Sequence, residues 1–278
     1  MSELAEALVR FEPWLRLSAF LGIFAILATW EAMAPRRVRA QLRRDRWFAN
    51  IGISALNSLA VRALSLLAAV AAAVFAERNG IGILHSVEAP LWMNVAISFV
   101  VLDLLVFGQH FALHHVPILW RLHRIHHADP DVDVSTGIRF HPVEIVLSQF
   151  LKAAVVLLLG ALPVSVILFE IVLNATTLFN HSNLKLSPRM DRIVRAVTVT
   201  PDMHRVHHSI RREEHDSNFG FNLSLWDRLF GTYRAQPMDG HETMTLGLSA
   251  YPGRTAIGLW WLLSNPFAGE VKSEPRGA

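Results

Sequence analysis

The sequence contains no cysteine, and only 18% of its 278 residues are charged. Without cysteine the chain cannot form a disulfide, a thiolate metal site, an iron–sulfur cluster or a thiol nucleophile, so any metal must bind histidine, aspartate or glutamate. The 26 Lys and Arg residues nearly balance the 23 Asp and Glu residues, which is not the charge balance of a nucleic-acid-binding protein. Apolar residues are in excess at 52%, more than an ordinary soluble domain carries.

Long apolar stretches predict an integral membrane protein. Three of them approach the length needed to cross a bilayer: residues 17–33, 52–76 and 91–107. A fourth stretch, residues 143–179, is interrupted near its midpoint by Gly160 and Pro163, which is typical of a helical hairpin. We therefore expect an all-α membrane helical bundle, with about four transmembrane helices or three spans plus the hairpin.

One short loop sets the expected orientation. Residues 36–46 include six Arg and a single Asp, and loops with such a bias stay in the cytoplasm. Two further crossings and the hairpin then return the later polar segments to the cytoplasmic side. We expect the protein in the inner or cytoplasmic membrane, with the apolar patch at residues 255–267, which is too short to span, at the membrane interface.

Histidine has the most unusual distribution of any residue type. Of the 14 His, 12 fall between His110 and His215. The first two are one helical turn apart, and the pattern His-Arg-aliphatic-His-His then occurs twice, which places three imidazoles on one face of each helix. These motifs supply eight candidate site residues: His110, His114, His123, His126, His127, His204, His207 and His208.

Eight imidazoles in this pattern predict a two-metal centre. One ion takes about four to six ligands, so eight neutral nitrogens imply a pair of ions. The chain has neither the Glu-x-x-His ligands of soluble di-iron bundles nor the His-Glu-x-x-His motif of zinc hydrolases, which favours redox chemistry over hydrolysis. For a single histidine such as His215 or His241, a structural role is the better interpretation.

These motifs resemble those of the fatty acid hydroxylase/sterol desaturase superfamily of membrane di-iron oxygenases, over roughly residues 103–234. The matching segments are His110 to His114 as the first histidine box, Leu119 to His127 as the second with its lead-in, Asp129 to Glu144 as a connecting stretch, Phe179 to Asn183 as an intermediate box, Thr200 to His208 as the last box, and Asn218 to Tyr233 as the terminal signature. The chain departs from the pattern in four places. Phe107-Gly108 precede His110 where Tyr-Trp is common, Phe111 follows His110 where Arg is common, His115 is an additional imidazole, and Thr177 stands where some relatives have another His.

The resemblance implies a ligand set and a reaction. Two iron ions would be held by the eight box histidines, with His181 as a further metal ligand, and O2 would be used to hydroxylate or desaturate a lipid. Two electrons would come from a separate reductase or ferredoxin-like donor, because His141-Pro142 continues with Val-Glu and not with the Gly-Gly of a haem-binding motif. The expected partners are therefore a lipid substrate, the membrane and an electron donor.

The expected organisation has three parts: membrane spans in residues 1–107, a catalytic region in 108–234 that includes the hairpin, and a C-terminal interfacial segment and tail in 235–278. The substrate is left open among fatty acyl chains, sterols, hopanoids, carotenoids, and ether or ornithine lipids. Whether His115, His141 or His181 binds metal is also left open, although only His181 lies in a segment that resembles a histidine box. A membrane protein that binds metal without catalysis is the alternative function.

Several polar residues fall inside the apolar stretches, where they need a partner. Asp103 lies on the same helical stripe as His110 and is expected to support the metal ligands from below. Glu144, Lys152 and Glu170 are expected to line a substrate path through the hairpin, or, for the first two, to reach the membrane interface.

The Arg-rich loop and the even number of crossings between the two His-Arg-aliphatic-His-His motifs give a topology that can be tested. We expect reporter fusions after Arg46 and after Thr232 to report the cytoplasm, and a fusion near Gly80 to report the opposite side. Paired alkaline phosphatase and fluorescent-protein fusions measure this. Opposite sides for the first two fusions would exclude the hairpin.

Overall fold

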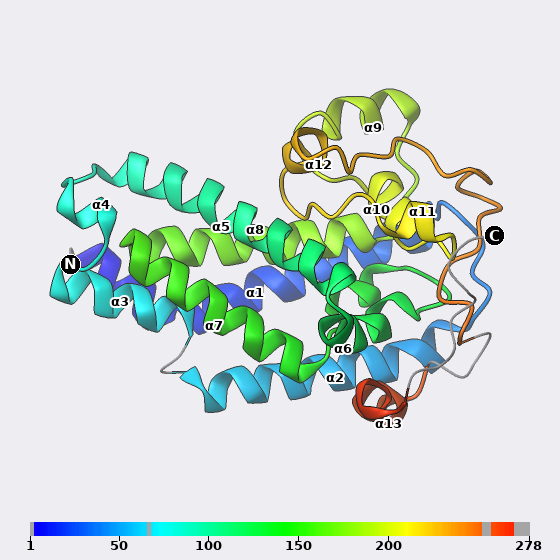
Figure 1. Ribbon diagram of the computed structural model, residues 1–278, viewed down its shortest axis with the longest axis horizontal. Coiled ribbons are helices and arrows are strands. Elements are labelled where there is room, and N and C mark those ends of the chain that lie inside the picture. Colours follow the sequence, from blue (N-terminus) through cyan, green and yellow to red (C-terminus); the bar gives the residue numbers. More distant parts are fainter. Residues whose placement is uncertain (1–2, 66–67, 252–256, 270–278) are drawn as a thin grey trace.

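The computed structural model describes residues 3–65, 68–251 and 257–269, and this part of the chain is helical, without a β-strand. Four helices are long and apolar enough to cross a membrane: α1 (Glu3–Met33, counted from Glu6), α5 (Leu91–His115), α7 (Pro142–Leu159) and α8 (Pro163–His181). They run along the long axis of the molecule, and most of the shorter helices gather at one end (Figure 1). The predicted all-α membrane bundle is confirmed.

The prediction of a single span at residues 52–76 is wrong. The segment belongs to two helices, α2 (Arg43–Ala63) and α3 (Ala69–Asn79), and neither is long and apolar enough to cross a membrane. The reason is that the two helices share contacts with α7 but differ in their other partners. α2 buries a polar face whose Asn57 amide donates to the Phe140 carbonyl at 2.9 Å, whereas α3 packs on α7 and α8. The two helices still follow one another along the bundle in the same direction (Figure 1).

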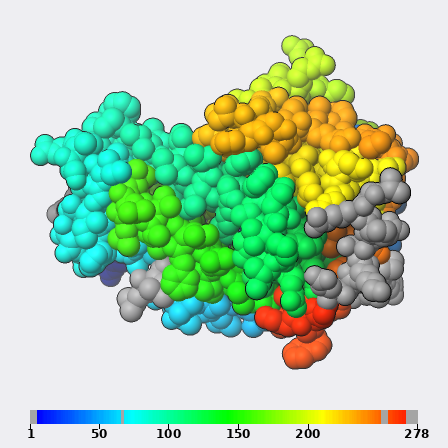
Figure 2. All heavy atoms as spheres, in the orientation of Figure 1, coloured from blue at the N-terminus to red at the C-terminus, as the bar shows by residue number. Residues whose placement is uncertain are grey.

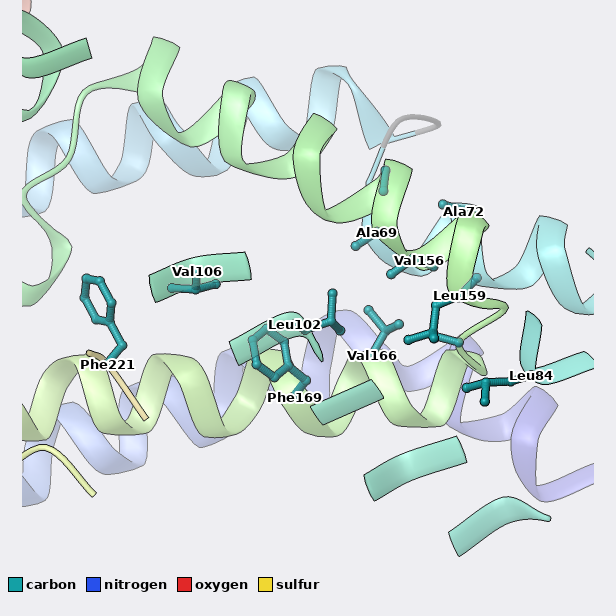
Figure 3. Packing of buried hydrophobic residues seen from close by; sticks show 13 residues of the cluster. Ala69, Ala72, Leu84, Leu102, Val106, Val156, Leu159, Val166, Phe169 and Phe221 are labelled. Carbon is teal, nitrogen blue, oxygen red and sulfur yellow. The ribbon is translucent and has the colours of Figure 1, made fainter. Parts of the chain in front are cut away.

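Small side chains bring α3 close to the hairpin. Four of its residues are buried where it contacts α7 and α8: Ala69, Ala72, Ala73 and Ala76. The first three belong to the same apolar cluster as Val156 of α7 and Phe169 of α8 (Figure 3). In a membrane, where lipid is as apolar as the side chains, close backbone approach of this kind stabilises helix contacts.

The hairpin turns at the end of the bundle away from most of the short helices. Only three residues separate α7 from α8, as the glycine and the proline predict. Gly160 has a φ of +73°, and a Cβ added to Gly82, whose φ is +104°, would lie 2.2 Å from the Gly160 nitrogen. Asn94 of α5 donates to the Gly160 carbonyl at 3.1 Å, so the turn is held by three segments of the chain.

The opposite end of the bundle carries what we call the cap, residues 116–141, 182–251 and 257–269. Its helices are α6 (Pro117–His127), η2 (Val134–Ile138), α9 (Pro188–Val194), α10 (Pro201–His207), α11 (Arg212–His215), α12 (Leu225–Leu229), α13 (Leu259–Ser264) and η4 (Asn265–Phe267); α4 (Ile83–Ser86) lies at the other end. α13 and η4 cover most of the patch predicted at the interface; residues 255–256 and the tail after 269 lie outside the described residues.

Arginines of the basic loop bind the bundle to the cap. Arg46 makes two hydrogen bonds to Asp129, at 2.6 and 2.7 Å, and one to Asp133 at 2.8 Å, and all three side chains are buried. Burial opposes ionisation of Asp129, but the guanidiniums of Arg46 and Arg139 lower its pKa to about 2. One of the six arginines on which the predicted orientation of this loop rests is therefore buried and paired with aspartates of the cap.

We expect Gly82→Ala to lower the free energy of unfolding by about 1–3 kcal/mol, because its backbone conformation is one that only glycine adopts freely and its added Cβ would strike the Gly160 backbone. Thermal unfolding in detergent measures the change. The control is Gly22→Ala in α1, where an added Cβ meets nothing within 4 Å. Equal stability of the two variants would contradict the close contact.

Candidate metal centre

Four helices converge where the bundle meets the cap, and each brings histidine to the same place. α5 carries His110 and His114 in its last turns, and α8 ends at His181. The two repeated motifs lie at the ends of α6 and α10: His123, His126, His127, His204, His207 and, directly after α10, His208. All nine side chains are buried, with at most 6% of the residue exposed.

The nine imidazoles divide into two groups that could each hold a metal ion, within which the candidate ligand atoms lie no more than 4.8 Å apart. The first is His110, His114, His123, His127 and His207; the second is His126, His181, His204 and His208. Each His-Arg-aliphatic-His-His motif is split between the groups: its first and last histidines enter one group and its middle histidine enters the other. Because of this spacing, α6 and α10 each carry histidines of both groups.

Facing nitrogens within the groups lie at the separation expected for ligands of one ion. His110 Nε2 is 3.2 Å from His123 Nε2 and 3.0 Å from His207 Nε2. In the second group, His181 Nε2 is 3.0 Å from the Nε2 atoms of both His126 and His204. Two nitrogens that bind one ion at right angles, each about 2.1 Å from it, are about 3.0 Å apart.

The tautomers of two of these rings show that a cation fits between them. His110 Nδ1 lies 2.7 Å from the Phe219 carbonyl oxygen, and His207 Nδ1 lies 2.6 Å from the Ser217 carbonyl oxygen. Because a carbonyl only accepts, both Nδ1 atoms carry the proton and both neutral rings present a lone pair at Nε2. No hydrogen bond can join two lone pairs 3.0 Å apart, but a metal ion between them can bind both.

Burial keeps the cap histidines in the form that binds metal. It lowers the pKa of His123 to about 3. Burial and, secondarily, neighbouring histidines hold the pKa values of His126, His127, His204, His207 and His208 well below the usual range. Neutral imidazole at pH 7 is the state that a metal requires.

Of the three histidines left open, His181 lies in the second group, and His115 and His141 lie outside both groups. His141 precedes α7, and its Nδ1 accepts a hydrogen bond from the Val143 N–H at 3.2 Å. His115 is exposed, with its Nδ1 on the Phe111 carbonyl at 2.8 Å. Sequence reasoning missed His215, whose ring centroid is 5.0 Å from that of His114 and 4.9 Å from that of His127. No spacing signal marks His215, because it approaches through the fold of the cap.

Glu144 is buried and supports a metal-ligand candidate, so its side chain does not extend to the membrane interface; its place on a substrate path stays a prediction. Its Oε1 accepts from His123 Nδ1 at 2.9 Å, so the ring presents Nε2 to the first group. A carboxylate in this position orients an imidazole and makes it more basic. The expectation for Asp103 is also wrong: it accepts from Trp226 Nε1 at 2.8 Å and from no ring of the centre. Seven residues separate Asp103 from His110, too many for direct contact along one helix.

The other polar residues of the hairpin pair with one another. Lys152 Nζ lies 2.6 Å from Glu170 Oε1, and Arg16 of α1 lies 2.8 Å from the other oxygen of the same carboxylate. Lys152 is 5% exposed, so it does not reach the interface. These ion pairs connect α1 to the hairpin and have no contact with the histidine groups.

The cap also fixes the carbonyl that orients His110. Asp227 of α12 accepts hydrogen bonds from the backbone N–H groups of Phe219 at 2.7 Å and Gly220 at 2.9 Å. The Phe219 carbonyl, on the same short segment, accepts from His110. In the sequence, Asp227 belongs to the Trp226-Asp227-Arg228 motif of the terminal signature. Its hydrogen bonds to the Phe219 and Gly220 N–H groups give this motif a structural role.

The fold and the site define a membrane-helix protein with a buried polyhistidine centre that could bind metal. The model of the fatty acid hydroxylase family matches residues 95–232, which contain every histidine of both groups. The chain belongs to the fatty acid hydroxylase/sterol desaturase superfamily, as its histidine boxes indicate.

Three relatives illustrate the range of the match. An ornithine lipid hydroxylase of Rhizobium tropici is 28% identical over 265 residues, which cover 92% of this chain and 76% of that protein. Human alkylglycerol monooxygenase is 27% identical over 55% of this chain but only 32% of its own length, and rat cholesterol 25-hydroxylase is 24% identical over 54% of this chain and 51% of its own. No solved structure matches the chain significantly.

Glu144→Ala removes the acceptor of the His123 N–H, so that ring is free to turn or change tautomer. We expect the variant to bind metal about 10- to 100-fold more weakly, as loss of a carboxylate behind a histidine ligand does elsewhere. Competition with a chelator, followed by metal analysis, measures this. The control is Glu213→Ala, an exposed cap carboxylate; equal metal retention in both variants would contradict the role of Glu144.

Proposed function

We propose that this protein is an iron-dependent lipid hydroxylase of the membrane, and that the nine convergent histidines hold two iron ions. The observation that carries the proposal is the pair of buried histidine groups, in which lone pairs at Nε2 face one another. Five imidazoles in one group and four in the other suit two ions with room for O2, which a single ion with nine ligands would not.

Bound iron would supply the activation of O2, so that a lipid C–H bond, O2, two electrons and two protons give a C–OH bond and one water. Desaturation begins with the same hydrogen abstraction and is the related outcome. The electrons would come from a separate reductase or ferredoxin-like donor. The family match and the monooxygenase and hydroxylase relatives support an oxidoreductase of this kind.

The residues of the chain would position the ions and exclude water. Glu144 and the carbonyls of Phe219, Ser217 and Thr177 each accept a hydrogen bond from an Nδ1–H group, which directs four Nε2 lone pairs inward. Aromatic rings cover the groups: Phe140 stacks on His126 at 4.5 Å, and the Phe221 ring is 4.8 Å from that of His110. A dry, preorganised site strengthens each of these interactions.

The proposed substrate is a membrane lipid whose polar end stays in the interfacial layer. The histidines lie at the cap ends of α5 and α8, so the ions would sit near headgroup depth, and the hydrocarbon tail would lie along the bundle. The ornithine lipid hydroxylase, which matches almost the whole chain, supports a polar membrane lipid over a sterol. We further propose that the cap faces the cytoplasm, as the Arg-rich loop indicates.

A membrane protein that binds metal without catalysis would share the histidine groups but not the redox activity. Reductant-dependent O2 uptake by the metal-loaded protein, with the oxidised lipid identified by mass spectrometry, separates the two functions. Comparison of the lipids of a deletion strain with those of its parent identifies the natural substrate, because the unoxidised lipid accumulates.

We expect the active protein to contain two iron ions per chain, and His207→Ala and His126→Ala, which remove one member of each group, to abolish lipid turnover and release metal. Iron analysis and the product assay measure both effects. The matched control is His115→Ala, next to His114 in sequence but exposed, which should retain metal and turnover. At most one ion in a fully active chain would refute the two-iron proposal.

A further inference from the structure

Apolar side chains gather on the outside of two short cap helices, α9 and α12. Six of them are between 51% and 65% exposed, and we call them the α9–α12 surface: Met190, Ile193, Val197, Leu225, Leu229 and Phe230. Single exposed apolar residues are normal, but a group of this size on one side of a cap marks a contact with something other than water.

The two helices form one surface because their ends are bound together. The Arg195 carbonyl, directly after α9, accepts from Ser224 Oγ at 2.7 Å and from Arg228 Nη2 at 3.1 Å. An isolated antiparallel bridge joins Thr198 to Leu223 a few residues further on. The apolar side chains of α9 and α12 therefore keep a fixed relation to each other.

Contacts with α5 determine where the α9–α12 surface lies along the length of the helix bundle. Asp103, inside the α5 span, accepts from Trp226 Nε1 at 2.8 Å and from the Leu223 N–H at 3.2 Å. Phe230 stacks on Phe107 of the same helix, with ring centroids 5.3 Å apart. α12 thus lies beside α5 and not beyond its end, as Figures 1 and 2 also show. The α9–α12 surface continues the lateral face of the spans.

A second contact holds the same segment to the neighbouring span. Thr176 of α8 donates to the Asn222 side-chain oxygen, and Asn180, one turn further along α8, donates to the Phe221 carbonyl at 3.3 Å. Both α5 and α8 are helices able to cross a membrane. The segment that carries α12 is therefore attached at the depth of two spans.

The exposed charges on the two segments that carry the surface have one sign. The exposed charged side chains of residues 185–198 and 223–230 are Lys185, Arg189, Arg192 and Arg228. The acids in these segments are buried: Asp191 pairs with Arg195 at 2.5 Å, and Asp227 binds backbone N–H groups. An apolar face with a cationic edge is the pattern of a helix that lies in the interfacial layer of an anionic membrane.

We propose that the α9–α12 surface is inserted in the interfacial layer of the bilayer, with its apolar side chains among the acyl chains and its Lys and Arg residues on anionic headgroups. The cap is then bound to the membrane through the α9–α12 surface as well as through the membrane-spanning helices. His110 lies seven residues beyond Asp103 on α5, about 10 Å along the helix, so the histidine groups sit just above the inserted surface. A lipid could reach them without leaving the bilayer.

The absence of cysteine from the sequence makes a direct test possible, because a single introduced cysteine is the only site for a thiol label. Ile193→Cys and Leu229→Cys place a fluorophore on the surface, Glu213→Cys places it on the exposed polar part of the cap, and Leu151→Cys places it on an exposed position in the middle of the α7 span. Each variant is reconstituted in nanodiscs of phosphatidylglycerol and phosphatidylcholine that carry nitroxide lipids. Iodide is the quencher from the aqueous side.

We expect the labels at 193 and 229 to be quenched several-fold more by headgroup nitroxides than the label at 213, and several-fold less by iodide. The label at 151 should respond most to acyl-chain nitroxides. Labels at 193 and 229 that behave like the one at 213 would overturn the proposal, because the surface would be in water. Shielding from both quenchers, together with cross-linked dimers, would also overturn it, since a second copy would then cover the surface.

Unchanged metal content and melting temperature show that a label has not disturbed the cap. Quenching needs no turnover, so the result is independent of the proposed reaction. A protein that fails to hydroxylate any lipid could still show the inserted surface, and an active hydroxylase could still show the surface in water.

Discussion

The structure depends on one constraint: nine neutral imidazoles are buried together with their Nε2 atoms facing inward. An imidazole in this position needs an acceptor for its Nδ1 proton, since a proton on Nε2 would occupy the place of the metal. Glu144 and the carbonyls of Thr177, Ser217 and Phe219 meet this need for four of the rings. Two of these carbonyls, those of Ser217 and Phe219, lie in the loop between α11 and α12, so this loop of the cap orients two of the rings.

The cap is held in place by buried charge. Arg46 binds Asp129 and Asp133, and Arg139 donates to the Ile125 carbonyl at 2.7 Å, within the motif that holds His123 and His126. Buried ion pairs contribute little net stability, because desolvation offsets most of their attraction, but they allow one arrangement of the segments that they join. Here that arrangement fixes the end of α6 against α2. The positive charge of the Arg-rich loop thus has a structural use inside the protein.

The bundle and the cap are stabilised by different kinds of packing. In the bundle, alanines of α3 and the glycine contact at the hairpin turn allow backbones to approach closely, which suits helices surrounded by lipid. In the cap, side chains such as Asp227 and Asn218 bind backbone groups of loops, with Asn218 donating to the carbonyls of Met203 and Arg234 at 2.9 and 2.8 Å. The histidine groups lie where these two kinds of packing meet, so ligands come from both.

The sequence by itself determined the features that depend on local periodicity: the apolar helices, the hairpin at Gly160 and Pro163, and the histidine motifs that place imidazoles on one helical face. It did not determine that α2 and α3 separate, that Glu144 supports His123, or that each His-Arg-aliphatic-His-His motif is divided between two groups. Those outcomes depend on which residues from distant segments become neighbours. A spacing of three or four residues fixes the face of a helix, but the direction in which that face points is decided only when the helices pack.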